Sequence, residues 1–299
     1  MLFGSEELKK SIKQGIEKCE QERDVKVVYA AVLGSIARGM QFADSDYDTR
    51  FLYIKKSFPD EKIRFPQKLP ESELIYRMQL ENIYFEQFSF WETTSFLHYL
   101  VYPSVDGKFS CGLYTVVGDT LLSPYAWDPY GLQQKLAPLL KECFHRDYYL
   151  ESRKQMLMHD CLGHSRVNIK VYLKQLHTAL SMNYAQRYGE FPPVYLPALL
   201  QSVSGELRHQ VLITLQNAQK KAKEYVKIHG TSARHDTGSF LSTERVEVID
   251  AYINHTIKEF EKFQMRHLCQ EEQAALEEQL EWGYAILEKS MKEEEPVIR

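Results

Sequence analysis

The spacing of apolar residues changes along the chain and divides it into two parts. In the first part, short β-branched runs alternate with polar turns, and the run VKVVYAAVL at 25–33 predicts a buried strand. From about residue 130, apolar residues recur every three or four positions, as in amphipathic helices. We therefore expect two domains, one over 1–128 and an all-helical one over 129–299.

The first part is expected to form a small mixed β-sheet with helices on one side. A helix is predicted at 5–22, a short helical segment after Gly34 and another helix near Trp91. Prolines among charged residues indicate a long loop or hairpin region between 55 and 80. The predicted strands are 25–33, 48–54, the run LIYRMQL, 83–90 and 113–118.

The second part shows the helical period throughout, apart from the polar loop HGTSARHDTGS at 229–239. The predicted helices are 131–145, 148–185, 195–201, 204–229, 243–263 and 270–291. The expected fold class is therefore α+β, a small sheet domain followed by a helical domain.

Composition adds few constraints. Apolar residues make up 44% and charged residues 26% of the chain, and the formal net charge is −4, so a strongly basic nucleic-acid-binding domain is excluded. The five cysteines show neither CxxC pairing nor metal-like spacing, which indicates reduced thiols and a cytoplasmic protein. No run reaches the roughly 18 apolar residues of a membrane-spanning helix, so we expect no membrane partner.

Candidate chemistry is concentrated in the segment AAVLGSIARGMQFADSDYDTRFLYI at 30–54. Asp46 and Asp48 stand two residues apart at the start of a predicted strand, so their side chains share one face. Two carboxylates this close repel each other unless a cation lies between them. Carboxylate oxygens suit Mg²⁺, and we expect two such ions to be held here.

The residues before the aspartates suit phosphate. Gly34 lets the backbone approach a ligand closely, and the Ser35 hydroxyl is a further donor. Arg38 offers a fork of donors to a phosphate, and Ser45 can bond locally beside the aspartates. The segment therefore predicts a phosphate-binding site beside the metal ions.

The order of these residues resembles the signature of the DNA polymerase β-type nucleotidyltransferase superfamily. Within it, the segment is most similar to the predicted RNA-repair (RlaP-like) nucleotidyltransferases, which carry Gly-Ser-x-Ala-x-Gly and then Ser-Asp-x-Asp before an apolar strand. The matching residues are Gly34, Ser35, Ala37, Gly39, Ser45, Asp46, Asp48, Phe51 and Tyr53.

The resemblance extends to the segment 170–200, which is similar to the family's C-terminal helix. His177 stands where the family has an arginine, and this is a departure from the pattern. The resemblance implies that Lys170 and His177 bind nucleotide, whereas spacing alone also allows a solvated basic stripe. The matching residues are Lys170, Tyr172, Leu173, Pro192 and Pro193.

The resemblance also implies a third carboxylate, on a later strand. Glu86 is the candidate for this catalytic and metal-binding position, although the alignment can instead place Gln87 there. Glutamate can bind Mg²⁺ and accept the proton of an attacking hydroxyl, whereas glutamine would weaken the metal site. The two alternatives stay open.

These observations predict a Mg²⁺-dependent nucleotidyltransferase that transfers a nucleotide from an NTP to an acceptor hydroxyl and releases pyrophosphate. The resemblance implies that the acceptor is an RNA end. An RNA ligase and a toxin-like protein are the candidate protein partners. One alternative is AMP transfer to a hydroxyl of a toxin-like protein. Another is a non-catalytic module that binds nucleotide or an RNA-ligase partner.

Overall fold

The structure is a computed structural model that describes residues 6–22, 25–42, 45, 47–55, 74–80, 83–105, 108–109, 111–158, 166–229 and 242–292. The chain folds as two units. The first comprises Met1–Gly34, Asp46–Phe144 and Leu268–Arg299, and the second comprises Ser35–Ser45 and His145–His267. The second unit thus takes its shorter segment from within the Gly-Ser and Asp-x-Asp region.

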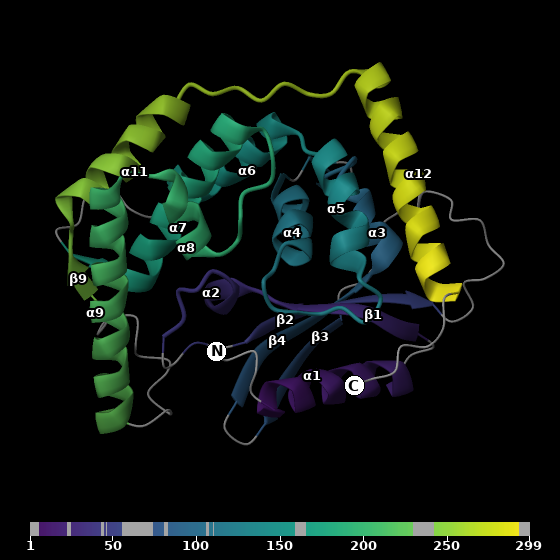
Figure 1. Cartoon of the computed structure of the whole chain (residues 1–299), viewed down its shortest axis with the longest axis horizontal. Coiled ribbons are helices and arrows are strands. Elements are labelled where there is room, and N and C mark those ends of the chain that lie inside the picture. Colours follow the sequence, from purple (N-terminus) through teal and green to yellow (C-terminus); the bar gives the residue numbers. More distant parts are fainter. Residues whose placement is uncertain are drawn as a thin grey trace. The chain divides into compact units, whose positions relative to one another are not determined.

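A five-stranded mixed sheet is the framework of the first unit (Figure 1). Its strands lie in the order β3-β4-β2-β1-β7; β2 and β4 are parallel, and the other neighbours are antiparallel. This confirms the α+β fold class with a small mixed sheet. The strands are β1 Val25–Val32, β2 Asp48–Lys55, β3 Leu74–Leu80, β4 Ile83–Glu92 and β7 Ala126–Trp127.

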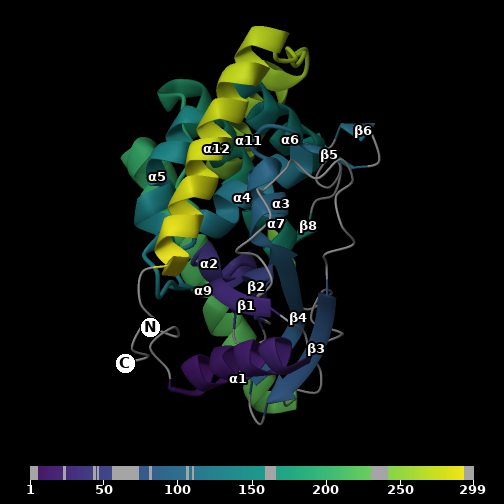
Figure 2. The ribbon, with the colours of Figure 1, turned by 90° about the vertical axis from the view of Figure 1, so that its right-hand side faces the viewer.

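Both faces of the sheet are covered at β1, because every residue from Val27 to Val32 is buried. Helix α1 (Glu6–Glu22) lies along one face and α4 (Cys111–Leu121) lies on the other (Figures 1 and 2). The Tyr29 hydroxyl donates a hydrogen bond of 2.9 Å to the Thr120 carbonyl, and burial raises the pKa of Tyr29. The helices of this unit are therefore not confined to the one side that the sequence predicted.

The strand predicted at 113–118 is wrong, since these residues lie in α4. A short apolar run has the same pattern in a buried strand and in a buried helix. Tyr114, Val117 and Leu121 are buried at spacings of three and four residues, which is the inward stripe of a helix.

The remaining helices of the first unit include one from the end of the chain. Helix α12 packs against α5, where Lys135 Nζ donates to Ser290 Oγ at 2.9 Å, although the sequence placed both helices in the helical half. Glu92, at the end of β4, accepts hydrogen bonds from the backbone of Thr94 and Ser95 and so caps α3. These elements are α3 Thr93–His98, β5 Ser104–Val105, β6 Lys108–Phe109, α5 Leu132–Glu142 and α12 Gln270–Lys292.

Over its described residues, the second unit is helical apart from one short two-stranded ribbon. The single helix predicted at 148–185 is wrong, because a strand, β8, separates α6 from α7. Asn168 accepts a hydrogen bond of 2.9 Å from Lys170 N and caps α7, which fixes where this helix begins. Helix α2, Gly34–Ala37, begins at the boundary with the first unit. The other elements are α6 Arg146–Met158, β8 Arg166–Asn168, α7 Ile169–Tyr188, α8 Leu196–Leu199, η3 Leu200–Ser202, α9 Gly205–His229, β9 Ser242–Glu244 and α11 Glu247–Phe260.

Over the described residues, none of the helices has the length and apolar character needed to span a membrane.

Tyr284 tests the placement of α12. Its side chain is 2% exposed and its hydroxyl donates to the Thr94 carbonyl at 3.2 Å, so Tyr284→Ala removes buried aromatic area and a contact with α3. We expect the free energy of unfolding to fall by about 3 kcal/mol in denaturant titrations. Trp282→Ala is the control: this side chain is 43% exposed, and its loss should change stability by less than about 0.5 kcal/mol. Equal losses in the two variants would contradict this packing.

Candidate active site

The carboxylate of Asp48 lies against the backbone of Gly34. The Leu33 amide donates a hydrogen bond of 2.8 Å to the Asp48 carbonyl, which holds the start of β2 beside the end of β1. Gly34 has a φ of 66°, and a Cβ atom there would collide with the Asp48 carboxylate. Glycine is therefore required here both by the backbone conformation and by the space that the carboxylate occupies.

Arg50 carries a positive charge on the same face of β2 as Asp48, two residues further along the strand. Its Nε donates to Ser89 Oγ at 3.3 Å and its Nη1 to Thr120 Oγ1 at 3.2 Å. The guanidinium also lies 5.1 Å from the centre of the Trp91 ring. This fixed cation was missed in the sequence, although strand alternation alone would have placed it beside the aspartates.

The strand register bears on the third carboxylate. In the parallel pair of β2 with β4, the backbone of Asp48 is level with that of Gln87, and Thr49 is level with Phe88. Position 87 therefore belongs to the Asp48 face of the sheet, and position 86 belongs to the other face. This backbone register favours Gln87 for the third-ligand position, while the role of Glu86 stays a prediction from the sequence.

Asp46 lies outside the described residues. Among the residues that are described, no group of three or more histidine, cysteine, aspartate or glutamate side chains is arranged to hold a metal ion. Metal ligation by Asp46 and Asp48 stays a prediction from the sequence.

The segment Ser35–Ser45 begins in α2, and hydrogen bonds among its described residues close it into a loop. The hydroxyls of Ser35 and Ser45 are 3.1 Å apart, and the Phe42 amide donates to Ser45 Oγ at 2.8 Å. The Met40 amide donates to the Ser35 carbonyl at 2.8 Å. The two serines predicted to bind phosphate therefore meet at the base of one loop.

Elements of the second unit hold this loop at two further points. The Leu196 amide donates to the Arg38 carbonyl at 2.9 Å, and Gln219 Nε2 donates to the Gln41 carbonyl at 2.9 Å. Gly39 has a φ of 69°, and a Cβ atom there would run into the ring of Tyr195. The contact of Gln219 with Gln41 joins residues 178 positions apart, so no local pattern in the sequence could reveal it.

The two residues predicted on α7 differ in their surroundings. Lys170 is half-buried, with its Nζ 5.8 Å from the centre of the Phe42 ring, so it lies beside the loop. His177 is 3% exposed, and its Nε2 is 2.8 Å from the Val194 carbonyl. This placement gives His177 a structural position, supporting the chain just before Tyr195 and Leu196.

The geometry thus brings together Gly34 with Asp48 in the first unit, and Ser35, Ser45, Arg38 and Lys170 around one loop in the second. In the first unit, Gly34 follows the end of β1 and Asp48 begins β2. The hydroxyl and cationic groups around the loop suit a phosphorylated ligand.

Comparison with known proteins supports this interpretation. Residues 8–87 match a sequence model described as "RlaP: RNA repair pathway DNA polymerase beta family". The chain is also 24% identical over 251 residues to a Bacillus subtilis (strain 168) protein named "Uncharacterized protein YcgL", covering 82% of this chain and 88% of that protein. The resemblance predicted from the Gly-Ser and Asp-x-Asp residues is confirmed: over 8–87, the chain is similar to the RNA-repair family of polymerase β-type nucleotidyltransferases.

Proposed function

We propose that the protein is a Mg²⁺-dependent nucleotidyltransferase that transfers a nucleotide from an NTP to a hydroxyl at an RNA end. The observation that carries the proposal is the Asp48 carboxylate packed against Gly34, at the start of a strand and two residues after Asp46. The family match over 8–87 supports the same class of reaction.

The residues fit Mg²⁺. Asp48 is half-exposed at the beginning of β2, and its carboxylate oxygens are the hard ligands that this ion prefers. One or two Mg²⁺ ions would be held by Asp46, Asp48 and a third residue at position 86 or 87. When bound, Mg²⁺ would neutralise phosphate charge and lower the pKa of an acceptor hydroxyl.

The protein groups would orient the NTP for in-line attack. Ser35, Ser45 and Arg38 would bind its phosphates, with Lys170 beside the same loop. The acceptor oxygen would form a bond to the α-phosphorus while the bond to pyrophosphate breaks, and the hydroxyl proton would pass to a carboxylate of the site. Holding these groups in place is the main contribution that such a site makes to the rate.

Two other functions remain candidates. The same groups could transfer AMP to a hydroxyl of a toxin-like protein. A second candidate is a non-catalytic module that binds nucleotide or an RNA ligase. It is favoured by the pairing of Gln87 with Asp48 in the strand register, because an amide in place of a carboxylate weakens a metal site.

One assay separates the three functions. The protein is incubated with Mg²⁺ and each α-³²P-labelled NTP, with and without RNAs whose ends are chemically defined. Label on RNA is the expected result. Label on protein alone would replace the RNA acceptor with a protein acceptor, and NTP binding without any label would support the binding module.

Asp48→Asn keeps the size of the side chain and removes its charge. We expect turnover in this assay to fall at least about 100-fold, equivalent to about 2.7 kcal/mol of transition-state stabilisation. Glu151→Gln, a charge-to-amide change on α6, is the control and should retain wild-type turnover. Thermal melts should show both variants folded, and full activity in a folded Asp48→Asn protein would rule out the metal mechanism.

The register of β4 predicts different results at the two candidate third-ligand positions. Gln87→Asp should lower the Mg²⁺ concentration needed for half-maximal activity several-fold, because it adds a carboxylate level with Asp48. Glu86→Gln should change this concentration by less than about twofold, because position 86 belongs to the other face of the sheet. Loss of activity in Glu86→Gln together with no response in Gln87→Asp would assign the role to Glu86.

Gly39→Ala should impair the loop Ser35–Ser45, which we propose binds phosphate. An alanine at a positive φ costs about 1–2 kcal/mol, and here its Cβ would also push on the Tyr195 ring, so we expect a lower kcat and a higher KM for NTP. Gly189→Ala is a matched control, because Gly189 has a φ of 66° and open space at its Cβ position. Tyr195→Ala added to Gly39→Ala should recover part of the lost activity, and no recovery would contradict the clash as the cause.

A further inference from the structure

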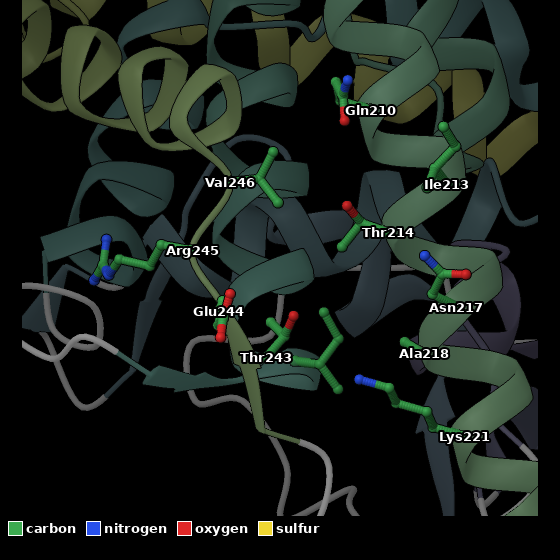
Figure 3. Close-up of a pocket in the computed structure, with 11 residues that line it drawn as sticks. Gln210, Ile213, Thr214, Asn217, Ala218, Lys221, Thr243, Glu244, Arg245 and Val246 are labelled. Atoms are coloured by element: carbon green, nitrogen blue, oxygen red, sulfur yellow. The ribbon is translucent and has the colours of Figure 1, made fainter.

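A pocket of about 280 Å³ lies in the second unit between α9 and the chain around β9 (Figure 3). Ile169, at the start of α7, also lines it. Apolar groups come from Ile169, Ala218 and Val246, and polar groups come from both walls. A volume near 300 Å³, with apolar surface and a few polar groups, is the usual form of a small-ligand site.

One wall is a polar stripe along α9. Gln210, Thr214, Asn217 and Lys221 follow one another at spacings of four, three and four residues, which places them on one face of the helix. Figure 3 shows these four residues along the α9 side of the pocket, across from Thr243. The pocket therefore receives two amides, a hydroxyl and an ammonium group from a single rigid element.

These polar groups are not used to hold the fold together. Within the described part of the chain, the side chains of Gln210, Asn217, Lys221 and Glu244 make no hydrogen bond or ion pair. Arg245, by contrast, pairs with Asp250 at 3.0 Å. Amide, ammonium and carboxylate groups that gather in a concave site without internal partners are available to a ligand.

The pocket adjoins the loop that carries the predicted phosphate-binding serines. Ile169 is followed by Lys170, which lies over Phe42 of the loop. Ala218 is followed by Gln219, which bonds to the Gln41 carbonyl. On two walls of the pocket, the residue that follows a pocket residue in the chain therefore contacts the loop. All of these residues belong to the second unit.

We propose that this pocket binds a nucleoside and selects its base, an inference that rests on the proposed nucleotidyltransferase function. Amide groups both donate and accept hydrogen bonds, so Gln210 and Asn217 can pair with the edge of a base. The apolar side chains of Ile169 and Val246 cover its faces.

The charged groups fit the rest of a nucleotide. Glu244 accepts hydrogen bonds from ribose hydroxyls, and Lys221 attracts a phosphate. One cation and one anion among the unpaired groups suit a single nucleotide, whereas a path for a nucleic-acid backbone needs several cations. The nucleoside can belong to the incoming NTP or to the last residue of an RNA end, and the experiment separates these sources.

The test measures equilibrium binding to the full chain without Mg²⁺, so that it does not depend on turnover. The probes are the four NTPs and four short RNAs that differ only in their terminal nucleotide. We expect the wild-type protein to prefer one base by about tenfold or more, and Asn217→Ala to reduce that preference about tenfold, as the loss of one or two hydrogen bonds predicts. Lys221→Ala should weaken all bases equally.

Matched neighbours on α9 serve as controls. Gln216→Ala removes an exposed amide beside Asn217, and Lys220→Ala removes an exposed ammonium group beside Lys221. Both variants should bind like wild type. An effect of Asn217→Ala on NTP binding alone assigns the pocket to the incoming nucleotide, and an effect on RNA alone assigns it to the acceptor end. Equal binding by Asn217→Ala and Gln216→Ala, or no base preference in the wild-type protein, would overturn the proposal.

The outcomes for the pocket and for the reaction are distinguishable. Base-selective binding that Asn217→Ala removes, with no label transfer in the Mg²⁺ assay, would retain the pocket and reject the transferase. Label transfer with unchanged base selection in Asn217→Ala would retain the transferase and reject the pocket.

Discussion

The contact between the Asp48 carboxylate and the backbone of Gly34 is the constraint on which the described site depends. It requires β2 to begin where β1 ends, which the hydrogen bond from Leu33 N to the Asp48 carbonyl secures. It also requires a residue without a Cβ at position 34, with a positive φ that turns the chain out of the strand. The sheet therefore fixes both the carboxylate and the direction in which the loop leaves.

Charge balance on the sheet follows from the same arrangement. Asp48 stands at the start of β2, and Arg50 places a positive charge on the same face of the strand. Hydrogen bonds to Ser89 and Thr120 and the Trp91 ring hold Arg50 in place, so β4 and α4 contribute to this face. The side chains on the Asp48 face thus link three elements of the first unit.

Local patterns in the sequence predicted much of this and missed what depends on distant contacts. The helix at 6–22 and the strands at 25–32 and 48–55 follow from spacing and β-branched runs, and the serine and aspartate residues follow from a motif. The run at 113–118 was misassigned because a short apolar segment has the same composition in a buried strand and in a buried helix.

Long-range pairing set the remaining features. The pairing of Gln87 with Asp48 depends on the register of β4 with β2, two strands that are separated in sequence by more than 25 residues. Tyr195 against Gly39 and Gln219 against Gln41 depend on how α8 and α9 pack around a loop in their own unit. No single-sequence pattern carries such information, because register and packing are decided by the partner segment.

The Gly-Ser and Asp-x-Asp motif is divided between the two units, at both ends of the segment Ser35–Ser45. Gly34 and Asp48 are held by the sheet, whereas Ser35, Arg38 and Ser45 belong with the helical unit that holds their loop through Leu196 and Gln219. The carboxylate position therefore depends on strand pairing, and the loop depends on helix packing. A substitution in α9 can therefore alter the loop, while strand pairing continues to hold the Asp48 carboxylate.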